Sequence, residues 1–502
     1  MKSGMSAKMI VIPQNFGYNI TYQEHGFVSR DTKNFIQKGL SINMKIELPQ
    51  KVDYIINELM KNGYEAYAVG GCIRDSILGK EPEDWDITTS AKPQEVKKLF
   101  RRTIDTGIVH GTVTVMLEKE GYEVTTYRID GEYEDNRRPK TVEFTADLIE
   151  DLKRRDFTIN AMAYNKLKGL VDVFNGLSDL QNGVIRCVGS ASERFDEDAL
   201  RILRAIRFSA QLGFEIEEKT LEAVIAKASN LEAISAERIR VELNKLLLSP
   251  HPEKLIDAQK SDITKVVLPE FDTMMNTEQN NPHHIYSVGM HSIKAVKEAG
   301  NSAVSFNPKE TLVLRWTLLL HDVGKPYCKT TDQKGDHFYG HAEKSAETAK
   351  LILRRLKFDN ETIDMVFRLI KWHDYKFSLT PQDMRKAVNK IGMDIFDLLF
   401  EVKAADTLAQ NPNTWKEKMD HLDQAKVIYQ EIKANQECVN LKMLKINGKD
   451  LIYIGFKPGK EMGEILNRLL EQVLDNPNLN EKQILLRMAL QYKPDGIENS
   501  EE

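Results

Sequence analysis

Two acidic residues separated by one position are the first candidates for chemistry in the 502-residue sequence. Asp84 and Asp86 flank Trp85 in a segment that we expect to be extended, and alternation along an extended chain turns both carboxylates to one face. Two carboxylates on one face repel each other unless a divalent cation neutralises them, and oxygen ligands suit Mg²⁺. Glu123 is a candidate third carboxylate. The alternative interpretation is an exposed turn in a charged stretch.

A pair of glycines precedes these carboxylates. Gly70 and Gly71 follow a strand-like run, and we expect a short helix directly after them. Glycine lets backbone N–H groups approach a phosphate without an intervening Cβ, and a helix N-terminus adds positive potential. Arg74, on the first turn of this helix, could reach the same anion. The pattern indicates either a phosphate-binding turn or a plain turn.

A carboxylate and a guanidinium are spaced for recognition of a base edge. Asp198 and Arg201 stand three residues apart on a helix predicted over 195–211, so both can address one ligand. A carboxylate that accepts from an amino group, beside a guanidinium that donates to a ring nitrogen, would select cytosine and adenine over uracil and guanine. The alternative is a plain i,i+3 salt bridge. Arg204 and Arg207 continue in steps of three and wind round the helix, so they meet either triphosphate, RNA or solvent.

A second cluster combines histidines with aspartates, each in a predicted helix or at a helix end. Its members are His291, His321, Asp322, His341, His373 and Asp406. Imidazoles mixed with carboxylates suit one or two transition-metal ions, and an adjacent His-Asp pair supplies two ligands from one helix end. A single histidine is usually an ordinary surface residue, but five such segments on amphipathic helices indicate a metal site.

The elements that must position these residues change along the chain. We expect a helix over 52–61 and strands over 65–69, 85–88, 112–117 and 122–128. The last two segments alternate between apolar and polar residues and are rich in β-branched residues, as half-buried strands are. Beyond about residue 195 the strands stop. Helical spacing then covers 195–211, 221–228, 236–248, 310–321 and 342–356. This order predicts a small α/β head followed by an all-helical body.

The composition is that of an ordinary globular protein. Hydrophobic residues make up 41% of the chain and charged residues 29%, and the formal net charge is −5, so nucleic-acid binding would depend on local basic patches. The four cysteines form no CxxC pair, which suits a reducing cytoplasm. No apolar stretch approaches the roughly 18 residues that span a bilayer. We therefore expect a cytoplasmic protein with no membrane association.

The order of GG, RD and DxD resembles the head of the nucleotidyltransferase superfamily, whose fold is polymerase β-like. The segments 131–139, 150–163, 194–214 and 446–466 extend the resemblance to the bacterial class II tRNA nucleotidyltransferases. These are the CCA-adding enzymes and the related poly(A) polymerases, and the resemblance covers about residues 44–488. The histidine series is similar to the HD phosphohydrolase domain, which some of these enzymes carry after the neck.

The resemblance implies a fold, a reaction and ligands. It implies an α+β nucleotidyltransferase head followed by an all-α neck, HD body and tail, and addition of C, C and A to the tRNA 3′ end from CTP and ATP. Asp84 and Asp86 would hold Mg²⁺, and Arg155 would be a further nucleotide contact. The HD site would hold one or two divalent transition metals (Mn, Ni, Co or Fe). Body and tail would hold the acceptor arm and elbow of tRNA. The residues themselves add that Lys457 and Lys460, on either side of a Pro-Gly turn, could bind RNA backbone, or are plain solvated lysines.

Five parts are expected along the chain. They are a weakly structured N-terminal extension over 1–43, the head over 44–180, a helical neck with the nucleotide-selecting helix over 181–275, the HD domain over 276–415 and a helical tail over 416–502. Polar stretches rich in Pro and Asn at 273–283 and 405–415 indicate two of these boundaries.

Several functions remain open at this level. The charged segment 131–139 favours full CCA addition or addition of the terminal A, over addition of CC alone. A poly(A) polymerase shares the head and neck, but this chain ends in an acidic tail. The HD site is either a phosphodiesterase or phosphatase, with Lys325 balancing phosphate charge, or vestigial. A last alternative makes this hydrolase the main activity and the head a tRNA-binding module.

Overall fold

The computed structural model describes residues 41–42, 45–131, 133–134, 138–139, 142–282, 284–301, 306–333 and 335–492. The chain forms two compact units: residues 1–235 with 261–266, and residues 236–260 with 267–502. Of the predicted N-terminal extension, only Ser41–Ile42 is described, and it forms strand β1. Much of the charged segment 131–139 lies outside the described residues.

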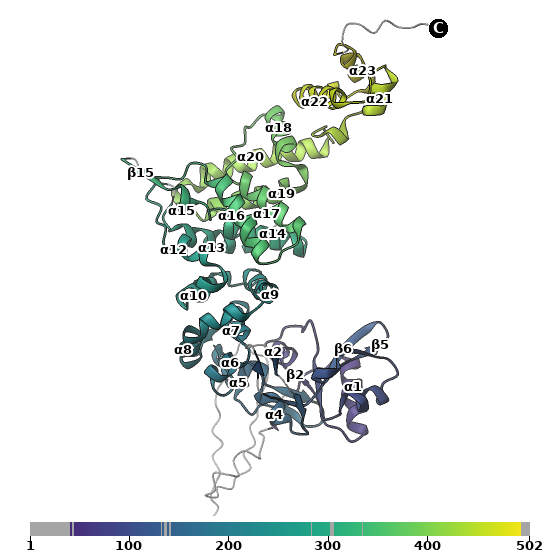
Figure 1. The fold of residues 1–502 in the computed structure, drawn as a ribbon, viewed down its shortest axis with the longest axis vertical. Coiled ribbons are helices and arrows are strands. Elements are labelled where there is room, and N and C mark those ends of the chain that lie inside the picture. Colours follow the sequence, from purple (N-terminus) through teal and green to yellow (C-terminus); the bar gives the residue numbers. More distant parts are fainter. Residues whose placement is uncertain are drawn as a thin grey trace, which may run out of the picture. The chain divides into compact units, whose positions relative to one another are not determined.

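A mixed eight-stranded sheet forms the centre of the first unit (Figure 1). Its strands follow the order β1-β12-β11-β2-β3-β6-β5-β4, and every neighbouring pair is antiparallel except β3 and β6. The strands of this sheet are β1 (Ser41–Ile42), β2 (Ala66–Val69), β3 (Ile87–Thr89), β4 (Thr103–Gly107), β5 (Thr112–Leu117), β6 (Glu120–Thr126), β11 (Ala163–Asn165) and β12 (Gly169–Val171). Three small pairs are β7 (Arg128–Asp130) with β10 (Val142–Phe144), β8 (Tyr133–Glu134) with β9 (Arg138–Pro139), and β13 (Val184–Ile185) with β14 (Glu215–Ile216).

Helices pack against this sheet and continue from it. They are α1 (Gln50–Lys61), α2 (Gly71–Ile77), α3 (Pro93–Leu99), α4 (Leu148–Lys153), α5 (Gly176–Asn182), α6 (Ala191–Glu197), α7 (Leu200–Leu212) and α8 (Glu218–Lys227). The apolar positions of α1 recur at helical spacing, so Val52, Ile55, Ile56 and Leu59 all lie on its buried face. Burial of each such side chain contributes roughly 1.5–3 kcal/mol. Together, the sheet and helices confirm the predicted α+β head.

The second unit is almost entirely helical. Its helices are α9 (Ala236–Leu247), α10 (Leu255–Lys260), α12 (Pro269–Met275), α13 (Val288–Glu298), α14 (Pro308–Leu320), α15 (Lys325–Cys328), α16 (His341–Arg355), α17 (Asn360–Trp372), α18 (Pro381–Ile391), α19 (Met393–Leu408), α20 (Trp415–Ala434), α21 (Gly448–Tyr453), α22 (Lys460–Asp475) and α23 (Lys482–Leu490). Helix α11 (Ile263–Val267) lies at the division between the units. A hairpin of β15 (Thr330–Asp332) and β16 (Gly335–His337) interrupts the helices. Among the described helices, none combines the length and hydropathy that a membrane-spanning helix needs.

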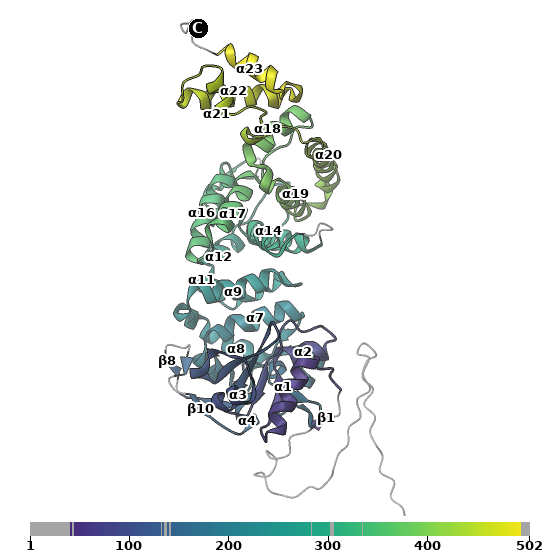
Figure 2. The same cartoon turned by 90° about the vertical axis from the view of Figure 1, so that its right-hand side faces the viewer.

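Two groups of helices have their own packing in this unit. Helices α13, α14 and α19 contact one another, and α17 contacts α14 and α19. Helix α16 lies against α17 in both views (Figures 1 and 2). Helices α21, α22 and α23 lie side by side (Figure 2). They enclose a separate hydrophobic cluster that includes Leu451, Leu469 and Leu485. The finer division into neck, body and tail remains a prediction.

The structure corrects two predictions made from the sequence. The single helix expected over 195–211 is wrong, because α6 ends at Glu197 and α7 begins at Leu200. Asp198 lies between them, and its Oδ1 accepts a hydrogen bond from the Leu200 N–H at 3.1 Å. Aspartate at such a position satisfies an N–H group that a new helix leaves unpaired. Strands also do not stop at residue 195, since β14 and the β15–β16 hairpin lie beyond it.

Candidate functional site

The turn between β2 and α2 requires glycine. Gly70 has φ +86° and ψ −132°, a conformation that other residues rarely adopt, and its N–H donates to the Met162 carbonyl at 3.1 Å. A Cβ on Gly70 would lie 2.8 Å from Nη1 of Arg155. The structure therefore brings the predicted phosphate turn and the predicted nucleotide contact Arg155 together.

Arg155 is a poorly compensated cation beside this turn. Its nearest carboxylate is Asp151, at 4.0 Å, and its Nη1 donates a long hydrogen bond of 3.5 Å to the Asn160 carbonyl. Its Nε is buried with no hydrogen-bond partner among the described residues. Burial lowers the pKa of Arg155, although the charge of Asp151 opposes this shift. An anion placed at the turn would satisfy this guanidinium.

The three candidate carboxylates of the head lie in one electrostatic environment. Asp86 immediately precedes β3, and β3 runs parallel to β6 with Ile87 opposite Val124, so Glu123 occupies the corresponding position on β6. The pKa of Asp86 is raised because neighbouring atoms displace water from its carboxyl group and because Asp84 is a like charge, while Arg155 opposes the shift. The pKa of Glu123 is raised by loss of water and by Asp86 and Asp84.

The open arrangement of these carboxylates fits Mg²⁺. In the described part of the chain, groups of three ligand atoms within 4.8 Å of one another occur in the second unit and not at Asp84, Asp86 and Glu123. Mg²⁺ keeps several of its waters and is commonly held by one or two carboxylates together with substrate phosphates. Asp84 is exposed, and Asp86 is exposed as a residue although its carboxyl group is partly shielded from water, so both can offer ligands near the surface.

An aromatic ring collects three of the predicted nucleotide-binding arginines. The guanidinium carbons of Arg207, Arg74 and Arg204 lie 3.8, 5.2 and 5.3 Å from the centroid of the Phe208 ring on α7. A cation over an aromatic face is attracted by the ring quadrupole. The guanidinium groups of Arg204 and Arg207 on α7 therefore converge with that of Arg74 on α2. Phe208 was not predicted, because an apolar residue in an amphipathic helix is usually part of the core.

A buried aspartate connects the same elements. Asp156 Oδ2 accepts from Nε of Arg204 at 2.8 Å, and Oδ1 accepts from the Asn160 amide at 3.2 Å. The Asn160 carbonyl oxygen of the side chain in turn accepts from Nη1 of Arg74 at 2.7 Å. Burial opposes ionisation of Asp156, yet the charge of Arg204 holds its pKa well below the usual range. This network ties α7 to α2.

Arg201 is held by three protein oxygens. Its Nη1 donates to the Arg194 carbonyl at 3.0 Å and to Glu197 Oε2 at 2.5 Å, and its Nη2 donates to the Arg154 carbonyl at 2.9 Å. Asp198, its predicted partner in base selection, lies in the link between α6 and α7. The two residues are therefore close in the chain, but they do not share one helix face, contrary to the prediction.

The histidine and aspartate series of the second unit converges on a single point. Nε2 of His291 lies 3.2 Å from Nε2 of His321 and 2.8 Å from Oδ1 of Asp406. Oδ2 of Asp322 lies 3.6 Å from the first of these nitrogens and 3.3 Å from the second. Its other oxygen, Oδ1, lies 3.5 Å from Nε2 of His341.

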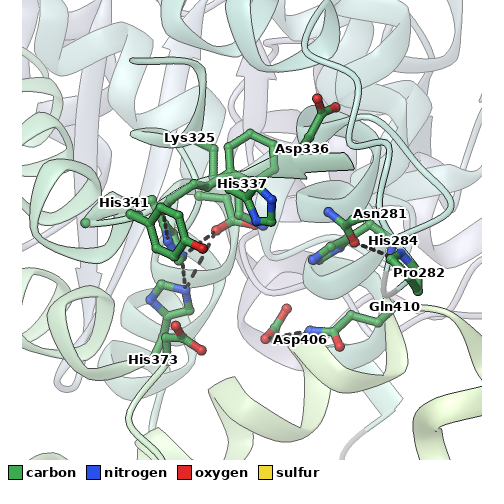
Figure 3. Close-up of a pocket in the computed structure, with 15 residues that line it drawn as sticks. Asn281, Pro282, His284, Lys325, Asp336, His337, His341, His373, Asp406 and Gln410 are labelled. Atoms are coloured by element: carbon green, nitrogen blue, oxygen red, sulfur yellow. Dashed lines mark hydrogen bonds and ion pairs between the residues drawn. The ribbon is translucent and has the colours of Figure 1, made fainter. Parts of the chain in front are cut away.

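His373 completes a second group around Asp322. Its Nε2 lies 3.7 Å from Oδ1 of Asp322 and 3.3 Å from Nε2 of His341 (Figure 3). The two oxygens of Asp322 therefore face two different sets of imidazoles. The structure brings all six predicted ligands together, with Asp322 between two subsites, an arrangement that suits one or two metal ions.

Backbone carbonyls orient all four imidazoles. The Nδ1 atoms lie near Ala409 O (3.3 Å from His291), Leu318 O (2.8 Å from His321), Phe338 O (2.9 Å from His341) and Ile370 O (2.6 Å from His373). An Nδ1–H that donates to a carbonyl leaves the Nε2 lone pair facing the other side chains of the cluster. Metal-binding histidines are commonly fixed in this way.

The charge of the cluster also fits a cation. Both oxygens of Asp322 are buried, and Lys325 Nζ lies 2.7 Å from Oδ2. Burial opposes protonation of His321, but Asp322 and Asp406 raise its pKa to about 10. The two carboxylates thus attract positive charge to the centre of the cluster, which a divalent cation would supply.

A cavity of about 440 Å³ opens over this cluster. His284, which was not predicted, lies in its wall, and its ring centroid is 4.9 Å from that of His291 (Figure 3). Burial, with the charge of Lys325, lowers the pKa of His284 to about 2. His284 lies in the loop before α13. Its approach to His291 therefore depends on the path of this loop, and helical periodicity in the sequence could not predict it.

The mixed sheet with a glycine turn, two neighbouring aspartates and converging arginines defines a nucleotidyltransferase of polymerase β-like fold. Residues 66–186 match the model of the Poly A polymerase head domain, and residues 213–275 match an RNA and SrmB- binding site of polymerase A. Residues 337–489 match tRNA nucleotidyltransferase domain 2.

Whole-chain similarity gives the particular family. The chain is 37% identical over 440 residues to the CCA-adding enzyme of Ligilactobacillus salivarius, covering 87% of this chain and 94% of the relative. It is 33% identical over 442 residues to that of Pediococcus pentosaceus, covering 88% and 97%. The crystal structure of the Bacillus stearothermophilus CCA-adding enzyme in complex with CTP is similar with a TM-score of 0.65 and 28% identity, over 88% of this chain and 97% of that one. The chain belongs to the CCA-adding enzyme family.

These findings confirm the predicted family and the predicted fold class of the head and helical body. Membership also implies that the head uses a divalent cation. The roles of individual residues, and the HD domain, stay predictions.

Proposed function

We propose that the protein adds C, C and A to the 3′ end of tRNA from CTP and ATP, without a nucleic-acid template and with release of pyrophosphate. The observation that carries this proposal is the 37% identity to a CCA-adding enzyme over nearly the whole of both chains. The similar B. stearothermophilus enzyme was solved with CTP, which supports CTP as a substrate.

The head residues divide the work of the reaction. Asp84 and Asp86, with Glu123 beside them, would hold Mg²⁺, which supplies activation of the 3′-hydroxyl and stabilisation of charge on the α-phosphate. Arg155 and the Gly70 turn bind the triphosphate. The 3′-oxygen attacks the α-phosphorus, the bond to the bridging oxygen breaks, and pyrophosphate leaves.

Two residues are proposed to select the nucleotide. Asp198 caps α7 through Oδ1. A carboxylate accepts several hydrogen bonds, so it can also accept from the amino group of cytosine or adenine. Arg201 would donate to the ring nitrogen from a guanidinium that protein oxygens hold in place. Arg74, Arg204 and Arg207 gather positive charge beside them for the triphosphate or the RNA.

The tail is proposed to contact tRNA, as the family resemblance implies. Lys457 and Lys460 are exposed on either side of Pro458-Gly459, and Lys460 is the first residue of α22. Exposed lysines at a turn can pair with backbone phosphates without reading sequence. The acceptor arm and elbow are the expected contacts.

Incorporation assays test the main proposal. Three tRNA transcripts, ending before CCA, after C and after CC, are incubated with Mg²⁺ and single nucleotides. Ordered growth to CCA followed by arrest supports the proposal. A added only after CC would indicate an A-adding enzyme, arrest after CC a CC-adding enzyme, and unlimited A a poly(A) polymerase.

We infer a second activity from the orientation of the four histidines. The cluster would act as an HD-type, metal-dependent phosphodiesterase or phosphatase. The side chains His291, His321, Asp322, His341, His373 and Asp406 would hold one or two divalent transition metals, which supply an activated water and stabilise charge on the phosphoryl group. The water oxygen attacks phosphorus, the ester P–O bond breaks, and the leaving alcohol takes a proton. Lys325 would balance the charge of Asp322 and of the phosphate.

Paired variants separate the two activities. Asp86→Ala should abolish nucleotide incorporation and leave hydrolysis intact, and His373→Ala should do the reverse. Hydrolysis is measured with Mn²⁺, Ni²⁺, Co²⁺ or Fe²⁺ on terminal and cyclic phosphates. If no metal supports hydrolysis of any of them, the cluster is vestigial. If hydrolysis proceeds and incorporation never does, the head is a tRNA-binding module.

A further inference from the structure

An exposed aromatic pair lies in the wall of the cavity over the histidine cluster. Tyr339 is 79% exposed, and its ring is stacked on that of His337 with centroids 5.5 Å apart and planes inclined by 8°. Both residues line the cavity. A large ring at this exposure buries little surface of its own, so it offers one aromatic face to a ligand in the cavity.

The stack is held in place before any ligand arrives. Asp336, which is 4% exposed, accepts from the Asn280 N–H at 2.8 Å and from the Thr331 hydroxyl at 2.7 Å, and it pairs with Lys329 at 2.9 Å. These contacts fix the β15–β16 hairpin. The His337 ring lies against the opposite strand, with its Nε2 3.0 Å from Asp332 Oδ1.

The same turn carries a member of the histidine cluster. The Phe338 carbonyl, next to Tyr339, lies 2.9 Å from Nδ1 of His341. Gly340 has φ +74°, which turns the chain sharply into α16, where His341 is the first residue. The stacking ring and the imidazole therefore sit on one short and constrained segment. A ligand that touches both would have an aromatic group close to a phosphoryl group.

We propose that this cavity binds a nucleoside phosphate, with the phosphoryl group at the histidine cluster and the base stacked on Tyr339. The proposal rests on the hydrolase function proposed above and names its substrate class. The volume of about 440 Å³ lies within the roughly 300–1,000 Å³ of small-molecule sites. Stacking accepts every base because each has a π face. The site therefore takes a free mononucleotide or the terminal nucleotide of an RNA, with little choice of base.

Substitutions of Tyr339 test the stack in the full-length, metal-loaded protein. Tyr339→Leu should raise KM for 3′-AMP and 3′-UMP by roughly 5- to 150-fold, as expected for loss of one stacked base, and leave kcat unchanged. Tyr339→Phe should behave as wild type. Glycerol 2-phosphate, which has no base, should be hydrolysed equally by all variants. Tyr327→Leu is the matched control, because Tyr327 is 57% exposed in the same unit but does not line the cavity.

Two further arms complete the test. KM is also measured for a short RNA with a 3′-phosphate and compared with KM for 3′-AMP. A rise of KM for either substrate in Tyr339→Leu supports the proposal and shows whether the site takes the RNA end or the free mononucleotide. An equal change of KM for glycerol 2-phosphate and 3′-AMP, or no change, would overturn it. If the wild type hydrolyses nothing, the proposed hydrolase fails. Equilibrium dialysis of labelled AMP then tests base stacking independently of hydrolysis. Equal affinity of wild type and Tyr339→Leu for AMP would overturn the proposal.

Discussion

Substitution of Gly70 by alanine separates backbone strain from loss of function at the phosphate turn. Gly63 provides a matched control, because both glycines have φ +86° and lie in the same unit. A Cβ on Gly63 meets no described atom within 4 Å, whereas a Cβ on Gly70 would lie 2.8 Å from Arg155 Nη1. Positive φ costs an alanine roughly 1–3 kcal/mol at Gly63, and at least as much at Gly70, whose ψ of −132° lies outside the left-handed helical region.

Gly70→Ala should lose at least as much stability as Gly63→Ala, and far more activity. The end of the Arg155 side chain is flexible, so it can move away from a new Cβ with little further cost in folding free energy. At roughly 2–4 °C per kcal/mol for a unit of this size, both variants should have a lower Tm, and the Tm of Gly70→Ala should fall at least as far as that of Gly63→Ala. Displacement of Arg155 removes a charge-assisted hydrogen bond to phosphate, worth roughly 1.5–3 kcal/mol. Gly70→Ala should therefore lower kcat/KM for CTP and ATP by roughly 10- to 150-fold.

Incorporation kinetics and thermal melts of the two variants check this reasoning. Gly63→Ala should keep the wild-type kcat/KM. Gly70→Ala introduced into Arg155→Ala should lower activity little beyond Arg155→Ala itself, because both changes remove one interaction. Equal activity of Gly70→Ala and Gly63→Ala would refute the role assigned to Arg155 and to the turn.

Three other predictions follow from the two sites. Asp86→Asn should abolish incorporation without lowering Tm at neutral pH. The pKa of Asp86 is raised in the folded state, so ionisation of its carboxyl group destabilises the fold as the pH rises, and the asparagine variant avoids this cost. Thermal melts of both proteins between roughly pH 4 and pH 7 measure the difference. Asp198→Asn should keep the cap on α7 and the wild-type Tm but lose the preference for C and A over U and G. Asp198→Ala should lose this preference and also roughly 0.5–2 kcal/mol of stability. Unchanged nucleotide selectivity in both variants would contradict the role assigned to Asp198. Removal of divalent metal by a chelator should lower the Tm of the second unit, by an amount equivalent to roughly 2.7 kcal/mol for metal at 100 times its Kd, and Asp322→Asn should show no such shift.

The head was predictable because its signals are local. Alternation of β-branched residues located β5, and the approach of Asp86 to Glu123 follows once β3 pairs with β6. The break before α7 left a local signal as well, since Asp198 is a preferred helix-capping residue. The apolar spacing around it favoured a continuous helix, and that periodicity outweighed the cap.

Contacts between distant segments were the part that the sequence could not show. Phe208 has the pattern of a core residue, and its three arginines converge only after α2 packs near α7. The histidine series was predictable by residue type and spacing. The approach of His284 and the stacking of Tyr339 on His337 depend on a loop and a short hairpin, whose geometry has no periodic signature.

The most direct test of the account follows the 3′ end of a single tRNA transcript that lacks CCA. The transcript is incubated with wild-type protein, Mg²⁺ and all four nucleoside triphosphates, and the products are resolved by length and sequenced at successive times. Three additions are expected from the wild type, C, C and then A, followed by arrest, and no addition is expected from Asp86→Asn. Incorporation of U or G, continued growth with A, or equal growth with Asp86→Asn would contradict it.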